Sequence, residues 1–281
     1  MIGDIHTLPI KEKVEKGFIV IKGTEEISLP FILTDEELTV GDTVDVFIYR
    51  EKRGNLVATT TLPRFTIGEY GWAEVVESLA NLGSFVQIGT TTDILVSMDE
   101  LPEQQQLWPE PGDKLYVMLQ VDKKGRLLAK PAKEIVFEEL YNFETDLELN
   151  DKVKGHIIRV DDEGAVMITD NQERGFIHHT EHDKEPRLGE YVTGRVIEVK
   201  EDGTLNVSLL PLKHERIGDD AQFLLAYIEE ANGVIPFGDK SDADSIRKTF
   251  HMSKSAFKRA LGNLMKNGKV EQRDGKTYLR S

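Results

Sequence analysis

The residues with the greatest capacity for chemistry form a group near position 180. The group consists of His178, His179, His182 and Asp183. Imidazole and carboxylate groups are ligands for zinc and other divalent first-row metals. Adjacent side chains of a strand point to opposite faces, so His178 and His179 cannot both bind one ion from a strand. The pattern therefore predicts no metal site.

The usual signatures of catalysis are missing from the sequence. There is no cysteine, which excludes a disulfide scaffold, a zinc ribbon and a cysteine nucleophile. We find no glycine-rich phosphate loop, nucleophile elbow or spaced carboxylate pair with a partner base. The acidic pairs at 25–26, 36–37 and 161–162 are typical of exposed loops. We therefore expect a protein that is not an enzyme and needs no cofactor.

A second distinctive segment is basic. The net charge of the chain is −15, yet Lys and Arg outnumber Asp and Glu in residues 217–281, by 11 to 9. Between Ser253 and Lys269 there are five basic residues and no acidic one. Attraction to phosphate groups should therefore be centred in this tail. The residues expected to touch nucleic acid are Lys254, Lys258, Arg259, Lys266, Arg273 and Lys276. A surface that docks a protein, or is merely solvated, is the alternative.

Three internal repeats precede the tail and must position most other residues. In each, a glycine and an acidic residue lead into an alternating strand, at Gly41, Gly112 and Gly189. A second glycine about 13 positions later leads into another strand, so each repeat ends in a β-hairpin. With further strands upstream, each repeat has about five strands, which suits a small closed barrel. The expected domains are 1–65, 66–147 and 148–216.

The final domain, 217–281, changes to helical spacing. A helix is expected from Asp220 to Ala231, and its apolar side would hold Phe223, Leu224, Tyr227 and Ile228. A second is expected from Ser241, with Asp244 placed as in a capping box.

A third helix is expected from near Ser253 to Gly268, followed by strands at 269–272 and 276–279. Its inward stripe would consist of Phe257, Ala260, Leu261, Leu264 and Met265. Three helices and a two-stranded hairpin make a winged helix, in which the third helix is the recognition helix of DNA-binding members.

The repeats resemble the S1 RNA-binding domain, a variety of OB-fold. The resemblance is carried in the third repeat by Gly155-His156-Ile157-Ile158, Gly175-Phe176-Ile177-His178 and Leu205-Asn206-Val207-Ser208, and it is weakest in the first repeat. The whole chain is similar to the conserved virulence factor B (CvfB/YitL) family, for example in Leu107-Trp108-Pro109 and Pro186-Arg187-Leu188-Gly189. That similarity implies a multidomain fold of three tandem S1-type OB-fold β-barrels (all-β) and an α+β winged-helix domain. It also implies RNA binding and an effect on gene expression.

The S1 resemblance assigns a base-stacking role to aromatic residues. Phe85 occupies the position of an S1 stacking aromatic, while Leu82 replaces the preceding one. In the third repeat both positions are lost, leaving Phe176, His178 and His179 on the next strand. The alternative is that Phe85 and Phe176 are core residues, because alternation does not fix which face they occupy.

S1 domains place the loop of the last hairpin against the phosphate backbone. The corresponding residues are Lys123, Lys124 and Arg126 in the second repeat, and Arg50, Lys52 and Arg53 in the first. The third loop, 200–203, is acidic. Exposed turns also collect charges by default, so a solvated loop is the alternative.

We expect a cytoplasmic protein without membrane contact, because no apolar run approaches the length of a spanning helix. The preferred function is relaxed-specificity binding of single-stranded RNA through the barrels and the tail. One alternative is a DNA-binding transcription regulator. Another is an assembly adaptor, in which acidic barrels dock basic partners such as ribosomal or RNA-processing proteins.

Overall fold

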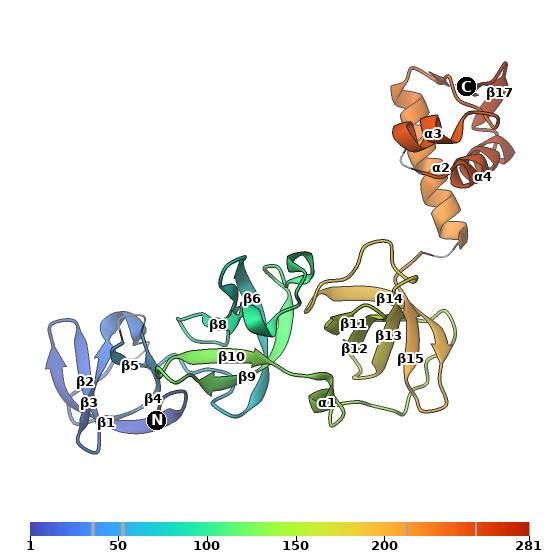
Figure 1. Ribbon diagram of the computed structural model, residues 1–281. Coiled ribbons are helices and arrows are strands. Elements are labelled where there is room, and N and C mark those ends of the chain that lie inside the picture. Colours follow the sequence, from blue (N-terminus) through green and yellow to red (C-terminus); the bar gives the residue numbers. More distant parts are fainter. Residues whose placement is uncertain (35–36, 52–53, 212, 251, 281) are drawn as a thin grey trace. The chain divides into compact units, whose positions relative to one another are not determined.

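The computed structural model describes residues 1–34, 37–51, 54–211, 213–250 and 252–280, without the side chains of 213–219. The chain divides into two compact units, Met1–Leu210 and Pro211–Ser281 (Figure 1). The first unit holds three closed five-stranded barrels and the second holds helices and a small sheet. Three barrels followed by a winged helix confirm the predicted fold class. No helix in the described part of the chain is both long and apolar enough to cross a membrane.

The three barrels share one strand order. In each, the first strand pairs with the second and the fourth, and the third and fifth strands form a parallel pair that closes the barrel. The first barrel consists of β1 (Ile5–Val14), β2 (Gly17–Lys22), β3 (Glu25–Pro30), β4 (Thr43–Arg50) and β5 (Leu56–Thr59). The second consists of β6 (Tyr70–Leu79), β7 (Gly83–Gln87), β8 (Ile94–Ser97), β9 (Lys114–Val121) and β10 (Leu127–Pro131). The third consists of β11 (Lys152–Asp161), β12 (Gly164–Thr169), β13 (Arg174–His178), β14 (Tyr191–Val199) and β15 (Leu205–Ser208). The predicted closing hairpins are confirmed in all three.

Glycines at the start of the second strands have a steric cause. A Cβ on Gly83 would lie 2.0 Å from the carbonyl oxygen of Val96, and one on Gly164 would lie 2.1 Å from that of Ile177. Both have positive φ angles, 129° and 147°. Only glycine allows the third strand to pass this close.

Adjacent barrels within the first unit are joined by main-chain hydrogen bonds. Gly3 N donates to Ile48 O at 2.7 Å, and Ile67 N donates to Gly3 O at 2.9 Å, which ties the linker of the second barrel to the first. Lys114 N donates to Gly189 O at 3.0 Å, between the second and third barrels. A short helix, α1 (Glu134–Phe137), lies in the linker before the third barrel. Among the described residues of this unit there are also 3-10 turns at Phe31–Leu33, Met98–Glu100 and Gln105–Leu107.

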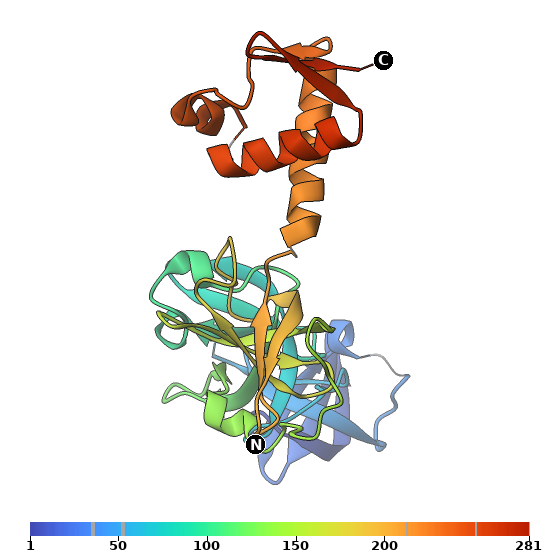
Figure 2. The ribbon, with the colours of Figure 1, turned by 90° about the vertical axis from the view of Figure 1, so that its right-hand side faces the viewer.

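The second unit is a winged helix (Figure 2). Its elements are α2 (Lys213–Glu230), β16 (Val234–Ile235), α3 (Ala243–Phe250), α4 (Lys254–Lys266), β17 (Val270–Arg273) and β18 (Lys276–Leu279). The sheet order is β16-β18-β17, so the predicted hairpin gains a third strand. The two-residue β16 was not predicted, because two residues are too short to show a period.

Details of the predicted helices need correction. The first begins at Lys213 rather than Asp220, because the apolar residues that revealed it start only at Phe223. Its buried residues are Ala221, Leu224 and Ile228, which leaves Phe223 47% exposed. Met265, predicted in the inward stripe of α4, is 44% exposed.

Capping fixes the starts of the other two helices. Asp242, not Ser241, caps α3, since its carboxylate accepts a hydrogen bond from Ser245 N at 2.9 Å. The predicted start of α4 is confirmed, because Ser253 accepts a hydrogen bond from Ala256 N at 3.2 Å.

Candidate nucleic-acid interface

The same three positions of each barrel form a row across its second, third and fifth strands. Strand pairing aligns one residue from each strand, and the three residues project from the same side of the sheet. The rows are Ile19, Ser28 and Val57 in the first barrel, Phe85, Leu95 and Leu128 in the second, and Val166, Phe176 and Asn206 in the third. The aromatic residue therefore lies on the second strand in one barrel and on the third strand in another.

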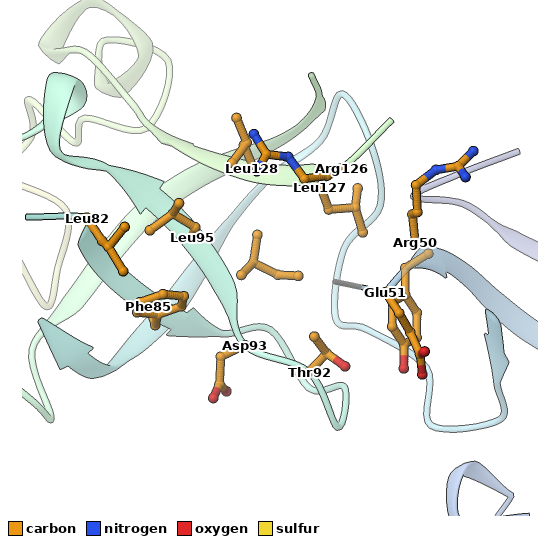
Figure 3. A pocket seen from close by; sticks show the side chains of 12 residues that line it. Arg50, Glu51, Leu82, Phe85, Thr92, Asp93, Leu95, Arg126, Leu127 and Leu128 are labelled. Carbon is orange, nitrogen blue, oxygen red and sulfur yellow. The ribbon is translucent and has the colours of Figure 1, made fainter. Parts of the chain in front are cut away.

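The row of the second barrel lines a groove of about 610 Å³ (Figure 3). Phe85 and Leu95 are half-buried, and Leu82 is 47% exposed. Figure 3 shows these three side chains together on one side of the groove. The interpretation of Phe85 as a core residue is wrong, because its ring lies on the groove wall rather than in the barrel interior. An apolar, accessible wall of this kind can stack a nucleobase.

The loop between β9 and β10 carries three basic residues, one of which lines this groove. Lys123 and Lys124 are exposed in the loop between β9 and β10, and within the described residues neither forms an ion pair. Arg126, which lines the groove, pairs with Asp122 at 2.7 Å. Hydrogen bonds from Arg126 N and Lys124 N lower the pKa of Asp122, so this carboxylate stays charged and fixes the loop. The loop therefore offers two cations without an ion pair among the described residues, within three positions of the groove-lining Arg126.

Arg50 of the first barrel lies against the same loop. A Cβ on Gly125 would lie 2.9 Å from Arg50 Nε, and both Arg50 and Arg126 line the groove. Sequence reasoning placed these residues in separate loops and gave no signal that the loops meet. Lys52 and Arg53 lie outside the described residues.

Two residues of the row of the third barrel, Phe176 and Asn206, line a smaller hollow of about 210 Å³ together with His178. The rings of Phe176 and His178 are 6.3 Å apart, and Phe176 is half-buried in the hollow rather than in the barrel core. His178 and His179 do not point apart as predicted, since their ring centroids are 4.1 Å apart. The reason is that β13 ends at His178 and the chain turns at once, with Thr180 Oγ1 2.8 Å from His178 Nδ1. Among the described residues, no group of three or more acidic or histidine side chains could hold a metal ion.

The linker covers part of the third barrel and neutralises its arginines. Val166 is fully buried in a cluster with Phe137 of α1. Glu134, also in α1, forms ion pairs with Arg159 and with Arg174, the latter at 2.6 Å. Sequence reasoning missed this cluster, because 25 and 40 residues separate Glu134 from its partners.

The basic face of the winged helix lies on α4. The buried side of the helix carries Phe257, Ala260, Leu261 and Leu264. Lys258, Arg259 and Lys266 are exposed, and Lys254 is half-buried. Within the described part of the chain none of these four forms an ion pair. Their charges are therefore available to a polyanion.

The wing contributes less charge than predicted. Arg273 donates to Glu271 at 2.8 Å and lies over the ring of Tyr278, 5.8 Å from its centroid. Hydrogen bonds from Arg280 and Arg273 lower the pKa of Glu271, which keeps this partner ionised. Lys276 is exposed and forms no ion pair among the described residues. Of the two predicted wing contacts, Lys276 is therefore the one whose charge is more available to a phosphate.

Comparison with known families covers almost the whole chain. An S1 domain model matches residues 2–61, and the first S1-like domain model of CvfB matches 70–130. The second-domain model of the virulence regulatory factor CvfB matches 137–211, and the CvfB-like winged helix domain model matches 222–279. S1 and winged-helix domains are nucleic-acid-binding types of domain rather than enzymatic ones.

Individual related proteins are similar to the chain over most of its length. The chain is 45% identical over 276 residues to the uncharacterized protein YitL of Bacillus subtilis, covering 98% of this chain and 93% of that protein. It is 37% identical over 246 residues to conserved virulence factor B of Staphylococcus aureus strain MRSA252, covering 87% and 82%. A crystal structure from Streptococcus pneumoniae TIGR4, titled a multidomain protein with nucleic acid binding domains, matches with 36% identity, 99% and 98% coverage and a TM-score of 0.67. The chain belongs to the conserved virulence factor B (CvfB/YitL) family.

Proposed function

We propose that this protein binds single-stranded RNA and thereby influences gene expression after transcription. The observation that supports this most is the groove of the second barrel, which Phe85 and Arg126 line. The loop that carries Arg126 also holds Lys123 and Lys124, which are exposed and form no ion pair among the described residues. An accessible aromatic wall can stack an unpaired base, and adjacent cations can hold its phosphates. Bases within a duplex are already stacked, so this groove fits a single strand.

The basic face of α4 is proposed as a second contact on the same strand. The chain as a whole carries a net charge of −15, so one cationic site alone is expected to bind a polyanion weakly. Linking two weak sites in one chain raises the effective concentration of the second. Useful affinity would therefore arise from the barrels and the winged helix together.

Sequence selectivity is expected to be low. The row of the second barrel, which forms one side of the groove, consists of Phe85, Leu95 and Leu128, and these side chains stack or pack on any base. Discrimination between bases needs hydrogen bonds to their edges, and the wall formed by the row of the second barrel offers none.

We further propose that this protein acts in the cytoplasm and is not an enzyme. Its acidic barrels could also dock basic proteins, among them ribosomal or RNA-processing proteins. This part of the proposal is supported by the acidic excess of residues 1–216 and by the lack of cysteine in the sequence.

A DNA-binding transcription regulator is the second candidate function. The observation that favours it is the position of the free cations on α4, the helix that enters the major groove in DNA-binding winged helices. In that case duplex DNA would bind better than either single strand.

The test is fluorescence anisotropy with labelled single-stranded RNA, single-stranded DNA and duplex DNA at several salt concentrations. The intact chain is compared with a Lys258→Ala/Arg259→Ala variant and with a matched control, Arg247→Ala/Lys248→Ala in α3, whose side chains are also exposed. We expect RNA to be preferred, and the α4 variant to lose about 0.7 from the slope of log affinity against log salt for each phosphate contact removed. A preference for duplex DNA would support the regulator, and no binding of any nucleic acid would contradict both.

A further inference from the structure

We infer that the first and second barrels build one composite nucleotide site, in which Arg50 of the first barrel holds a phosphate of the strand whose base lies on Phe85. The inference rests on the proposed function and deepens it. It gives the first barrel, the most divergent repeat, a direct part in RNA binding.

The groove itself is made by both barrels. Tyr49 and Arg50 end β4 and Glu51 follows them, and the other lining residues come from the second barrel. Figure 3 shows Arg50 and Glu51 across the groove from Phe85, with Arg126 on the rim between them. A ligand that fills the groove must therefore touch both barrels.

The first-barrel side of the groove is held in place by packing. Phe47, Tyr49 and Val57 are buried in the same cluster as core residues of the second barrel. Arg50 directly follows this buried segment and pairs with Leu56 in the sheet. Its backbone is therefore positioned by the contact between the barrels.

The guanidinium of Arg50 is incompletely satisfied. One terminal nitrogen donates to Gly54 O, whereas Nε is buried without a hydrogen-bond partner. Among the described residues Arg50 has no carboxylate partner. A guanidinium has five N–H donors in a planar fork that matches phosphate oxygens, so an anion at this rim would use the terminal N–H donors that Gly54 O leaves free.

Glycine at position 125 allows two cationic segments to meet. With φ at 77° and a hypothetical Cβ 2.9 Å from Arg50 Nε, a larger residue would push the loop and Arg50 apart. The close approach gathers Arg50, Lys123, Lys124 and Arg126, of which only Arg126 has an ion-pair partner within the described residues. Like charges held together repel, and a bound phosphate removes that repulsion.

The test uses the full chain and a short labelled single-stranded RNA. Arg50→Gln removes the charge, and Arg64→Gln is the matched control, because Arg64 is exposed and does not line the groove. We expect Arg50→Gln to weaken binding about tenfold, as a lost charge-assisted hydrogen bond does, and to reduce the salt slope by about 0.7. Arg64→Gln should change neither.

A coupling measurement separates a shared nucleotide from independent contacts. If one nucleotide touches both residues, the double variant Arg50→Gln/Phe85→Ala should lose less affinity than the product of the single losses. Purely multiplicative losses would contradict the composite site.

Photochemical crosslinking of RNA to the unmodified protein tests the composite site without any substitution, and so does not depend on whether Arg50→Gln folds. We expect adducts on the peptide containing Tyr49 as well as on the peptide containing Phe85. Adducts confined to the second barrel, or equal affinities of the Arg50→Gln and Arg64→Gln variants, would overturn the composite site while leaving the proposed function intact. No RNA binding by the unmodified protein would instead overturn the proposed function.

Discussion

The second and third barrels share a strand order but present different outer faces. In the second, Phe85 lines an open groove together with Arg126, whose loop also carries two exposed lysines without an ion pair among the described residues. In the third, the equivalent position is Val166, which is buried under the linker. The positions are equivalent because Phe85 pairs with Leu95 as Val166 pairs with Phe176. The same fold therefore supplies one open and one partly covered surface, and the linker makes the difference.

The second and third barrels also differ in the charge of these faces. In the second barrel Glu77 of β6 pairs with Phe85. At the equivalent position of the third barrel Arg159 of β11 pairs with Val166, so an acid stands in one barrel where an arginine stands in the other. The arginine of the third barrel is paired with Glu134 and Asp161. Free positive charge in the second barrel comes from its loop instead. Counting basic residues in each barrel would thus rank the two surfaces incorrectly.

The largest effect is expected from the aromatic residues. Phe85→Ala should cost about 1–3 kcal/mol of RNA-binding free energy, the usual value of one stacked base. Phe176→Ala should cost less, since part of the surrounding face is covered by α1. Anisotropy titrations of both variants check the order, and a larger loss for Phe176→Ala would reverse the comparison.

Removal of the loop charges should have the next largest effect. Lys123→Gln/Lys124→Gln should reduce the salt slope by about 1.4 if each lysine meets one phosphate. The matched control is Lys152→Gln/Lys154→Gln, which removes two exposed lysines from β11 of the third barrel. Salt titrations that give equal slopes for both variants would mean that the groove is not the cationic site.

Breaking the ion pairs of Arg159 and Arg174 should make the surface of the third barrel more like that of the second. Glu134→Gln removes the carboxylate shared by Arg159 and Arg174. We expect RNA affinity to rise a few-fold, with a small loss of thermal stability because the ion pairs are only partly buried. Glu138→Gln, a nearby exposed change, is the control, and anisotropy with a melting curve measures both quantities. An unchanged affinity would show that the paired arginines do not limit binding.

The smallest expected effect concerns the junction between these barrels. His156 lies 5.1 Å from Trp72 and 4.9 Å from Tyr191, ring to ring, and burial lowers its pKa below the ordinary 6.5 despite a hydrogen bond to Gly189. Lys114 also lowers this pKa, whereas Asp170 and Asp113 raise it. The folded state therefore favours the neutral ring. The resulting contribution to the free energy of unfolding is fully present above pH 6.5 and is lost as the pH falls below that value.

Urea unfolding at pH 7.5 and at pH 5.5 measures this contribution. The unmodified protein should lose more unfolding free energy between these values than His156→Gln does. His182→Gln should behave like the unmodified protein, and equal pH dependence in all three would exclude the junction histidine as the cause.

Much of the fold could be predicted from local patterns. Glycine spacing and period-two alternation located the closing hairpins, and the stripe of Phe257, Ala260, Leu261 and Leu264 located α4. Phe223 and Met265 were misplaced because apolar character alone does not decide which helix positions the core can reach.

Placement of the site could be predicted less well. The candidate residues Phe85, Lys123 and Lys124 follow from the S1 pattern. The contact of Arg50 with Gly125 and the pairing of Glu134 with Arg159 and Arg174 depend on how barrels and linker pack. No periodicity within one repeat carries that information.

The bond between Lys114 and Gly189 also has a consequence for the order of synthesis. Asp113, next to Lys114, binds Arg187, which is 74 residues later in the chain. At about 5–20 residues per second, the ribosome needs about 4–15 s to make that stretch. Early in this interval β9 and β10 are made and complete the strands of the second barrel, but the main-chain donor of Lys114 still lacks Gly189 and the carboxylate of Asp113 still lacks Arg187. A nascent chain therefore exposes this edge to solvent and chaperones before the third barrel covers it.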